Sequence, residues 1–212
     1  ILEDLKTLYL VGHLHLIDVD ATYFVGRLQH SVKTLYPYLQ KSLTGKVGSD
    51  AKFKKNLFDW AVKQGIANYA APGFYETVSR QMVYRLLARI LFYQTLRRHW
   101  SSLPQIDLSG LSADTANKKL REIFEQARQI DWHAVFEEDF SDSIAVPDSG
   151  IEELDKLIKD LNRFNFSIMP QDVIGAVFEK LIPYEERHSL GQYFTPENLV
   201  DLINAFCVRT ID

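Results

Sequence analysis

The sequence "MVYRLLARILFYQTL", residues 82–96, has the composition of a helix that is buried among other helices. Drawn as a helix, it carries apolar side chains around most of its circumference, whereas a surface helix has a single apolar stripe. We therefore predict a central helix over residues 74–100. The sequence "AAPG" at 70–73 should precede it, and a turn at Leu103-Pro104 should follow it.

The segment before this central helix predicts more helix. Asp20 is suited to cap a helix whose apolar residues recur at helical intervals. Pro37 should kink or end that helix, because proline lacks the backbone N–H that a helix interior uses. The sequence "SLTGKVGSD" at 42–50 is rich in turn residues and predicts a surface loop.

Caps and apolar spacing predict three further helices, the first of which lies before the central helix. Ser49 or Asp50 should cap a helix with one apolar side, and a more polar helix should cover about residues 113–130. Ser149 stands three residues before Glu152, which is the spacing of a capping box. The predicted inward residues of the first of these helices are Phe53, Leu57, Phe58, Ala61 and Val62. Alternation with a period of two is nowhere sustained, so the predicted fold class is all-α, a multi-helix bundle.

The turn-rich sequence "SDSIAVPDSG" at 141–150 marks a predicted joint between two parts. We predict a helical region over residues 1–145 and a second part over residues 146–212. The sequence begins at Ile1 rather than Met, so we expect it to start within a longer protein.

Composition limits the classes of function. Hydrophobic residues make up 46% and charged residues 25% of the 212 residues, which is typical of a globular protein. Charged residues interrupt every apolar run before the ~20 residues that span a bilayer, so we expect no membrane partner. The single cysteine, Cys207, suits a reducing cytosol and predicts a cytoplasmic location. The net charge of −4 means that contact with nucleic acid needs a local basic patch or parts outside this sequence.

Five arginines lie in a stretch, residues 77–106, that holds no acidic residue: Arg80, Arg85, Arg89, Arg97 and Arg98. Two interpretations stay open. Arg85 and Arg89 could bind DNA phosphates, in which case affinity should fall steeply with salt and show little sequence preference. Alternatively, the arginines lie at the rim of the core and pair with acidic segments such as Glu137-Glu138-Asp139.

The usual motifs of catalysis and metal binding do not occur. His13 and His15 are two residues apart and so do not converge on one helix face. Glu185 and His188 have the Glu-x-x-His spacing of di-iron bundles, but no other histidine follows a glutamate at that distance. We therefore predict no catalytic residue and no metal site in this sequence.

The hexapeptide Gly191-Gln192-Tyr193-Phe194-Thr195-Pro196 is the most unusual sequence in the chain. Thr195, Pro196 and Glu197 together predict the start of a helix, because threonine caps, proline fits the first turn and glutamate complements the helix dipole. The loop thus brings two aromatic rings to a helix N-terminus, which favours anions such as a carboxylate. The rings could cover a purine or a sulfonium.

The longer sequence "DVIGAVFEKLIPYEERHSLGQYFTPENLVDLI", residues 172–203, resembles the entry into the catalytic domain of adenine-specific, amino-group DNA methyltransferases. These are the modification subunits of type I restriction systems and the fused type II enzymes. The resemblance implies that a helical region leads into a Rossmann-like methyltransferase domain, of which this sequence holds only the beginning. It also implies that Gln192, Tyr193, Phe194, Thr195 and Pro196 contribute to the pocket for S-adenosylmethionine.

The same resemblance implies the partners. They are double-stranded DNA and a restriction nuclease domain or a specificity subunit. The family's Asp-Pro-Ala-Cys-Gly-Ser-Gly cofactor loop and its Asn-Pro-Pro-[Tyr/Phe] motif are both absent from the 212 residues, so this sequence alone should be inactive. The alternative is a free-standing helical interaction module in which "GQYFTP" is only a helix cap.

Overall fold

The computed structural model describes residues 21–66, 68–130 and 133–163, with residues 177, 180–183, 187, 188 and 199. The chain divides into two compact units, Ile1–Leu181 and Ile182–Asp212, and the helices described below belong to the first. Every regular element within the described residues is helical, which confirms the all-α prediction. The Rossmann-like part stays a prediction.

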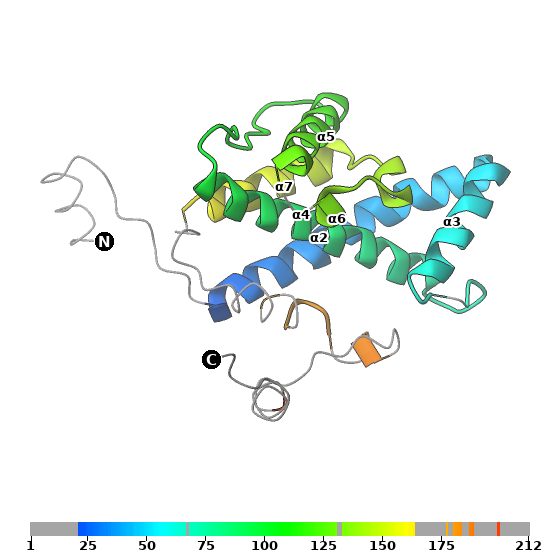
Figure 1. Ribbon diagram of the computed structural model, residues 1–212. Coiled ribbons are helices and arrows are strands. Elements are labelled where there is room, and N and C mark those ends of the chain that lie inside the picture. Colours follow the sequence, from blue (N-terminus) through cyan, green and yellow to red (C-terminus); the bar gives the residue numbers. More distant parts are fainter. Residues whose placement is uncertain are drawn as a thin grey trace, which may run out of the picture. The chain divides into compact units, whose positions relative to one another are not determined.

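The first unit is built from long helices around a central pair (Figure 1). The pair consists of α2 and α4, with α7 packed on α2 and with α5 and the short α6 packed on α4. Helix α3 packs against α2 at the end of α2 that is far from its first residue. The bounds are α2 Ala21–Ser49, α3 Ala51–Lys63, α4 Phe74–His99, α5 Ala113–Ile130, α6 His133–Phe136, the 3₁₀ turn η1 Phe140–Ser143, and α7 Asp148–Leu161.

Helix α4 matches the predicted central helix to within one residue. Its side chains Val78, Leu87 and Ile90 are fully buried, as expected for a segment that is apolar around most of its circumference. Near its end, the buried Tyr93 hydroxyl donates to the carbonyl oxygen of Pro104 at 2.6 Å, which fixes the turn that follows. Burial raises the pKa of Tyr93 to about 12, so this hydroxyl stays a donor at neutral pH.

Helix α2 corrects the prediction of a loop at 42–50. The helix contains Pro37 and continues through almost the whole predicted loop. Leu39 and Leu43 are 3% and 0% exposed. Burial of these side chains stabilises the helix beyond the residue at which local propensity would end it. The Thr44 hydroxyl donates to the Gln40 carbonyl at 2.9 Å and needs no turn to be satisfied.

Helix α3 confirms the predicted cap, but not the whole of the predicted apolar face. The Asp50 carboxylate accepts the backbone N–H of Phe53 at 2.9 Å. Leu57 is buried as predicted, together with Trp60 and Ala61. Val62, however, is 53% exposed, whereas Trp60 is buried and hydrogen-bonded to Asp139.

The capping box predicted at Ser149 and Glu152 is wrong. Helix α7 begins at Asp148 and has no side-chain cap of its own. The Asp148 carboxylate instead accepts the backbone N–H of Ala113, the first residue of α5, at 2.7 Å. A Cβ on Gly150 would lie only 2.6 Å from a Val146 methyl carbon. The lack of a side chain at Gly150 therefore lets the Val146 side chain pack closely against the start of α7. The division predicted at residues 145 and 146 stays a prediction, although α7 packs on α2 within the first unit.

Among the helices that the structure describes, none combines the length and the apolar character needed to cross a bilayer.

Candidate functional site

The residues predicted to bind S-adenosylmethionine, Gln192, Tyr193, Phe194, Thr195 and Pro196, lie outside the described residues. The same holds for His13, His15 and Glu185. Within the described part of the chain, no three His, Cys, Asp or Glu side chains come together in a way that could hold a metal ion.

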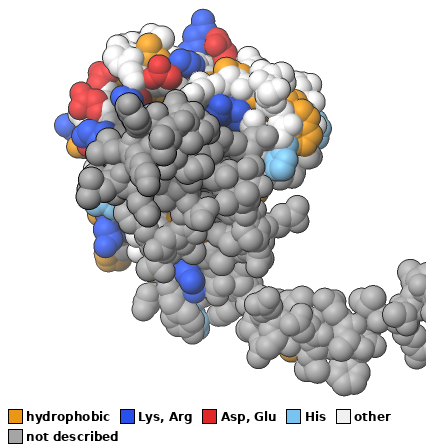
Figure 2. Space-filling model, turned by 90° about the vertical axis from the view of Figure 1, so that its left-hand side faces the viewer, with side chains coloured by type: hydrophobic (Ala, Val, Ile, Leu, Met, Phe, Trp, Pro, Cys, Tyr) orange, Lys and Arg blue, Asp and Glu red, His pale blue; other side chains and the backbone are white. Residues whose placement is uncertain are grey.

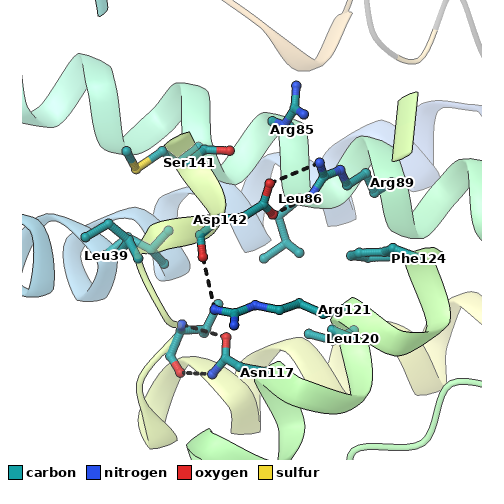
Figure 3. A pocket seen from close by; sticks show the side chains of 13 residues that line it. Leu39, Arg85, Leu86, Arg89, Asn117, Leu120, Arg121, Phe124, Ser141 and Asp142 are labelled. Atoms are coloured by element: carbon teal, nitrogen blue, oxygen red, sulfur yellow. Dashed lines mark hydrogen bonds and ion pairs between the residues drawn. The ribbon is translucent and has the colours of Figure 1, made fainter. Parts of the chain in front are cut away.

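The two arginines predicted to contact DNA lie side by side on α4 and face the segment 137–146, which we call the strap (Figure 3). Arg89 is 3% exposed. Its guanidinium forms a two-pronged ion pair with the Asp142 carboxylate, in which Nη2 lies 3.1 Å from Oδ2. It also donates to two backbone carbonyls, that of Val135 at 3.1 Å and that of Glu137. Arg89 is therefore fully engaged within the chain.

Arg85 makes a second, more exposed attachment to the strap. Its Nη2 donates to the Glu137 carbonyl, and its Nη1 lies 3.3 Å from the Asp139 carboxylate. Burial and the neighbouring Arg89 lower the pKa of Arg85 against the opposing effect of Asp139. Asp139 also accepts the indole N–H of Trp60 at 2.9 Å, which ties α3 to the same segment.

These contacts confirm the second interpretation for Arg85, which pairs with Asp139 of the acidic segment 137–139. Arg89 binds the Glu137 carbonyl of that segment but forms its ion pair with Asp142, and Arg80 pairs with Glu76 of its own helix. Contact of Arg85 and Arg89 with DNA stays a prediction, and any phosphate would have to compete with Asp139 and Asp142 for their donors. Asp142 itself is the partner that the sequence analysis missed. It lies beyond the quoted acidic triplet, in the turn η1, and only the fold of the strap brings it to Arg89.

Helix α5 holds the other side of the strap. Arg121 donates to the Asp142 carbonyl at 3.1 Å. The Asn117 amide donates to the Val146 carbonyl at 2.8 Å and accepts the Val146 N–H at 2.9 Å, as in a strand pair. The space between these groups and α4 is a cavity of about 50 Å³. A water molecule needs at least ~10–15 Å³ of such space, so the cavity is large enough to hold water. This cluster therefore fixes the strap against α5.

Because of Asp139 in the strap, the free energy of unfolding should change with pH in the acidic range. Burial would raise the pKa of its carboxyl, but hydrogen bonds from Ser141 and Trp60 and the charge of Arg85 outweigh that and lower the pKa below the ordinary 3.8. A lowered pKa in the folded state stabilises the protein above the unfolded-state pKa, and this stabilisation is lost as the pH falls through the folded-state pKa.

We expect Asp139→Asn to be less stable than wild type at neutral pH, with the gap closing as the pH falls below about 3.8. Urea unfolding followed at a series of pH values measures both proteins directly. A gap of constant size from neutral to strongly acidic pH would show that the Asp139 charge contributes nothing.

A second feature lies on the outward face of α3, where an open groove of about 370 Å³ borders the exposed ring of Tyr69. The rings of Phe58 and Tyr69 stack with their centroids 4.6 Å apart and their planes inclined by 13°. The ammonium of Lys54 lies 5.7 Å from the centre of the Phe58 ring. The sequence signal for this groove was the spacing of Lys54, Phe58 and Val62, each four residues apart and hence on one stripe of a helix.

The charges on another face of the molecule are mixed. On the side drawn in Figure 2, Lys and Arg side chains of the described residues lie among Asp and Glu side chains. In physiological salt the fields of such exposed charges are largely screened beyond ~8 Å.

Comparison with known proteins found no match: neither a family model, nor a curated protein, nor a solved structure is similar to this chain.

Proposed function

We propose that the chain is the helical region and first cofactor loop of an adenine-specific DNA methyltransferase of a restriction–modification system. The enzyme would transfer a methyl group from S-adenosylmethionine to the amino group of adenine in DNA. The observation that carries the proposal is the hexapeptide "GQYFTP" at 191–196, set within the longer resembling sequence at 172–203. The all-helical character of the described residues is consistent with the region that precedes the catalytic domain in that family.

The chemistry of the hexapeptide suits this cofactor. Thr195 and Pro196 predict a helix start, whose free backbone N–H groups would receive the methionine carboxylate. Tyr193 and Phe194 would offer ring faces to the sulfonium or the adenine. A ligand with a carboxylate, a cation and a purine uses every one of these groups.

The motifs present in the 212 residues suggest which steps this chain and the rest of the enzyme would each carry out. Neither the glycine-rich cofactor loop nor the Asn-Pro-Pro-[Tyr/Phe] motif is among them, so the groups that hold the adenine amino nitrogen belong to another part of the enzyme. The helical unit would orient DNA or connect the enzyme to a nuclease domain or a specificity subunit. Access to an adenine in a duplex requires that the base be flipped out of the stack.

Thr195 gives the sharpest test of the cofactor loop. In the intact methyltransferase that includes this chain, Thr195→Ala removes a hydroxyl that would bind the methionine carboxylate. Losing a hydrogen bond to a charged group costs roughly 1.5–3 kcal/mol, so S-adenosylmethionine should bind about tenfold to a hundredfold more weakly in a calorimetric titration. As a helix cap, the residue should also contribute ~1 kcal/mol to stability.

Asn198→Ala is the matched control, because Asn198 stands just inside the same predicted helix and makes neither contact in our proposal. It should bind the cofactor as tightly as wild type. If Thr195→Ala stays folded and also binds as tightly as wild type, then "GQYFTP" is only a cap. The free-standing interaction module would then be the better account.

A further inference from the structure

We propose that the groove on the outward face of α3 binds a single-stranded segment of nucleic acid, with Lys54 and Lys55 on its phosphates and Tyr69 against a base. This proposal is independent of the cofactor loop at 191–196, and it concerns residues that the structure describes. The lysines of this surface are exposed, whereas Arg85 and Arg89 of α4 are engaged by the strap.

The charge around α3 departs from that of the whole chain. Residues 41–63 contain six lysines and two aspartates, and six minus two gives a formal charge of +4, whereas the whole chain carries −4. All six lysines are exposed: Lys41, Lys46, Lys52, Lys54, Lys55 and Lys63. Lys46 is occupied in part, because its ammonium donates to the Ser143 carbonyl at 2.7 Å. Residues 41–63 thus carry a positive formal charge within an acidic protein, and the neighbouring strap carboxylates Asp139 and Asp142 are already paired with Arg85 and Arg89. Polyanions are the partners that such a cluster of lysines attracts.

The aromatic pair beside the lysines adds a feature that phosphate binding alone does not need. Tyr69 is 55% exposed and stacks on Phe58, so its other ring face is offered to a ligand. Phe58 is in turn held edge-to-face by the buried Phe74, with ring centroids 5.6 Å apart. The stacked pair of Phe58 and Tyr69 is thus held in place by the first residue of α4. A supported aromatic face beside basic side chains is the arrangement with which proteins bind unpaired bases.

The size and lining of the groove favour a nucleic-acid strand over a helix of a partner protein. The volume of about 370 Å³ falls within the ~300–1,000 Å³ of small-ligand pockets, so a single base fits. A docked amphipathic helix buries several apolar side chains in a hydrophobic groove. Here Val62 is the sole large aliphatic side chain among the lining residues, and the charged Asp59 lies beside it. Asp59 also offers a carboxylate that can accept from an N–H group of a base, such as N3–H of thymine.

The test is the binding of a fluorescein-labelled oligothymidylate to the 212-residue chain, followed by fluorescence anisotropy. We expect wild type to bind, with an affinity that falls as salt rises. Tyr69→Ala should weaken binding roughly fivefold to 150-fold, the range of a lost base–aromatic stack, while Tyr69→Phe should bind like wild type. The exposed side chain of Tyr69 can be removed without opening the core, and circular dichroism verifies that the helices are retained.

The double variant Lys54→Ala/Lys55→Ala tests the phosphate contacts. It should reduce the steepness of the log K against log [salt] plot by about 1.4, since each phosphate contact to a single strand contributes ~0.7. Lys118→Ala/Lys156→Ala removes the same charge from α5 and α7 and should leave the slope unchanged. The proposal is overturned if wild type does not bind the oligonucleotide, if Tyr69→Ala binds as well as wild type, or if the two double variants weaken binding equally.

Discussion

Replacing Arg89 with leucine should lower the free energy of unfolding by about 3–5 kcal/mol, the cost of removing one partner from a buried ion pair. The variant leaves the Asp142 carboxylate, only 20% exposed, without its two-pronged partner. It also leaves the Val135 carbonyl without its donor and the Glu137 carbonyl with Arg85 as its remaining side-chain donor. The leucine would restore packing against Phe124, whose ring centre lies 5.6 Å from the guanidinium carbon, but it cannot donate to the Asp142 carboxylate or the Val135 carbonyl.

Chemical denaturation of wild type and variant measures this loss. Arg128→Leu is the control, because Arg128 pairs with Glu125 of the same helix at the surface, and its loss should change stability little. If Arg89→Leu is as stable as wild type, then hydrophobic contact replaces the ion pair at no cost. The contacts from α5, Arg85 and Trp60 would then be enough to hold the strap.

Leu87→Ala should cost about 2–5 kcal/mol, because it combines the lost transfer free energy of a buried side chain with the cavity that remains. Leu87 is 0% exposed and lies at the middle of α4, on the face between the helices. The neighbouring Leu86 is only half-buried and borders the small water-sized cavity, so Leu86→Ala should cost clearly less. Equal losses at the two positions would contradict the placement of α4 at the centre of the bundle.

Local signals in the sequence predicted a large part of this fold. The central helix, the cap at Asp50 and the helix over 113–130 depend on residues that are close together in the chain, and the structure confirms each of them. The end of α2 could not be predicted in this way. Residues that usually form turns continue that helix because Leu39 and Leu43 are buried against other elements, and a local pattern does not contain that information.

The candidate sites show the same difference between what local sequence predicts and what depends on the fold. The pairing of the α4 arginines with residues 137–139 was one of two interpretations of the sequence, since an apolar helix must place its few charges at the rim of the core. The pairing of Arg89 with Asp142, and its bond to the Glu137 carbonyl, depend on how the strap folds. The groove on α3 likewise needs Tyr69, which comes from the segment after the helix and meets Phe58 only in three dimensions.

The proposed methyltransferase function is tested most directly by methyl transfer to DNA. The intact enzyme that includes this chain, incubated with labelled S-adenosylmethionine and duplex DNA, should place the label on the amino group of adenine, as detected by mass spectrometry of the digested nucleosides. The 212-residue chain alone should transfer no label above a control without protein. The account would be contradicted if the intact enzyme left the adenines unmodified, or if the isolated chain methylated them.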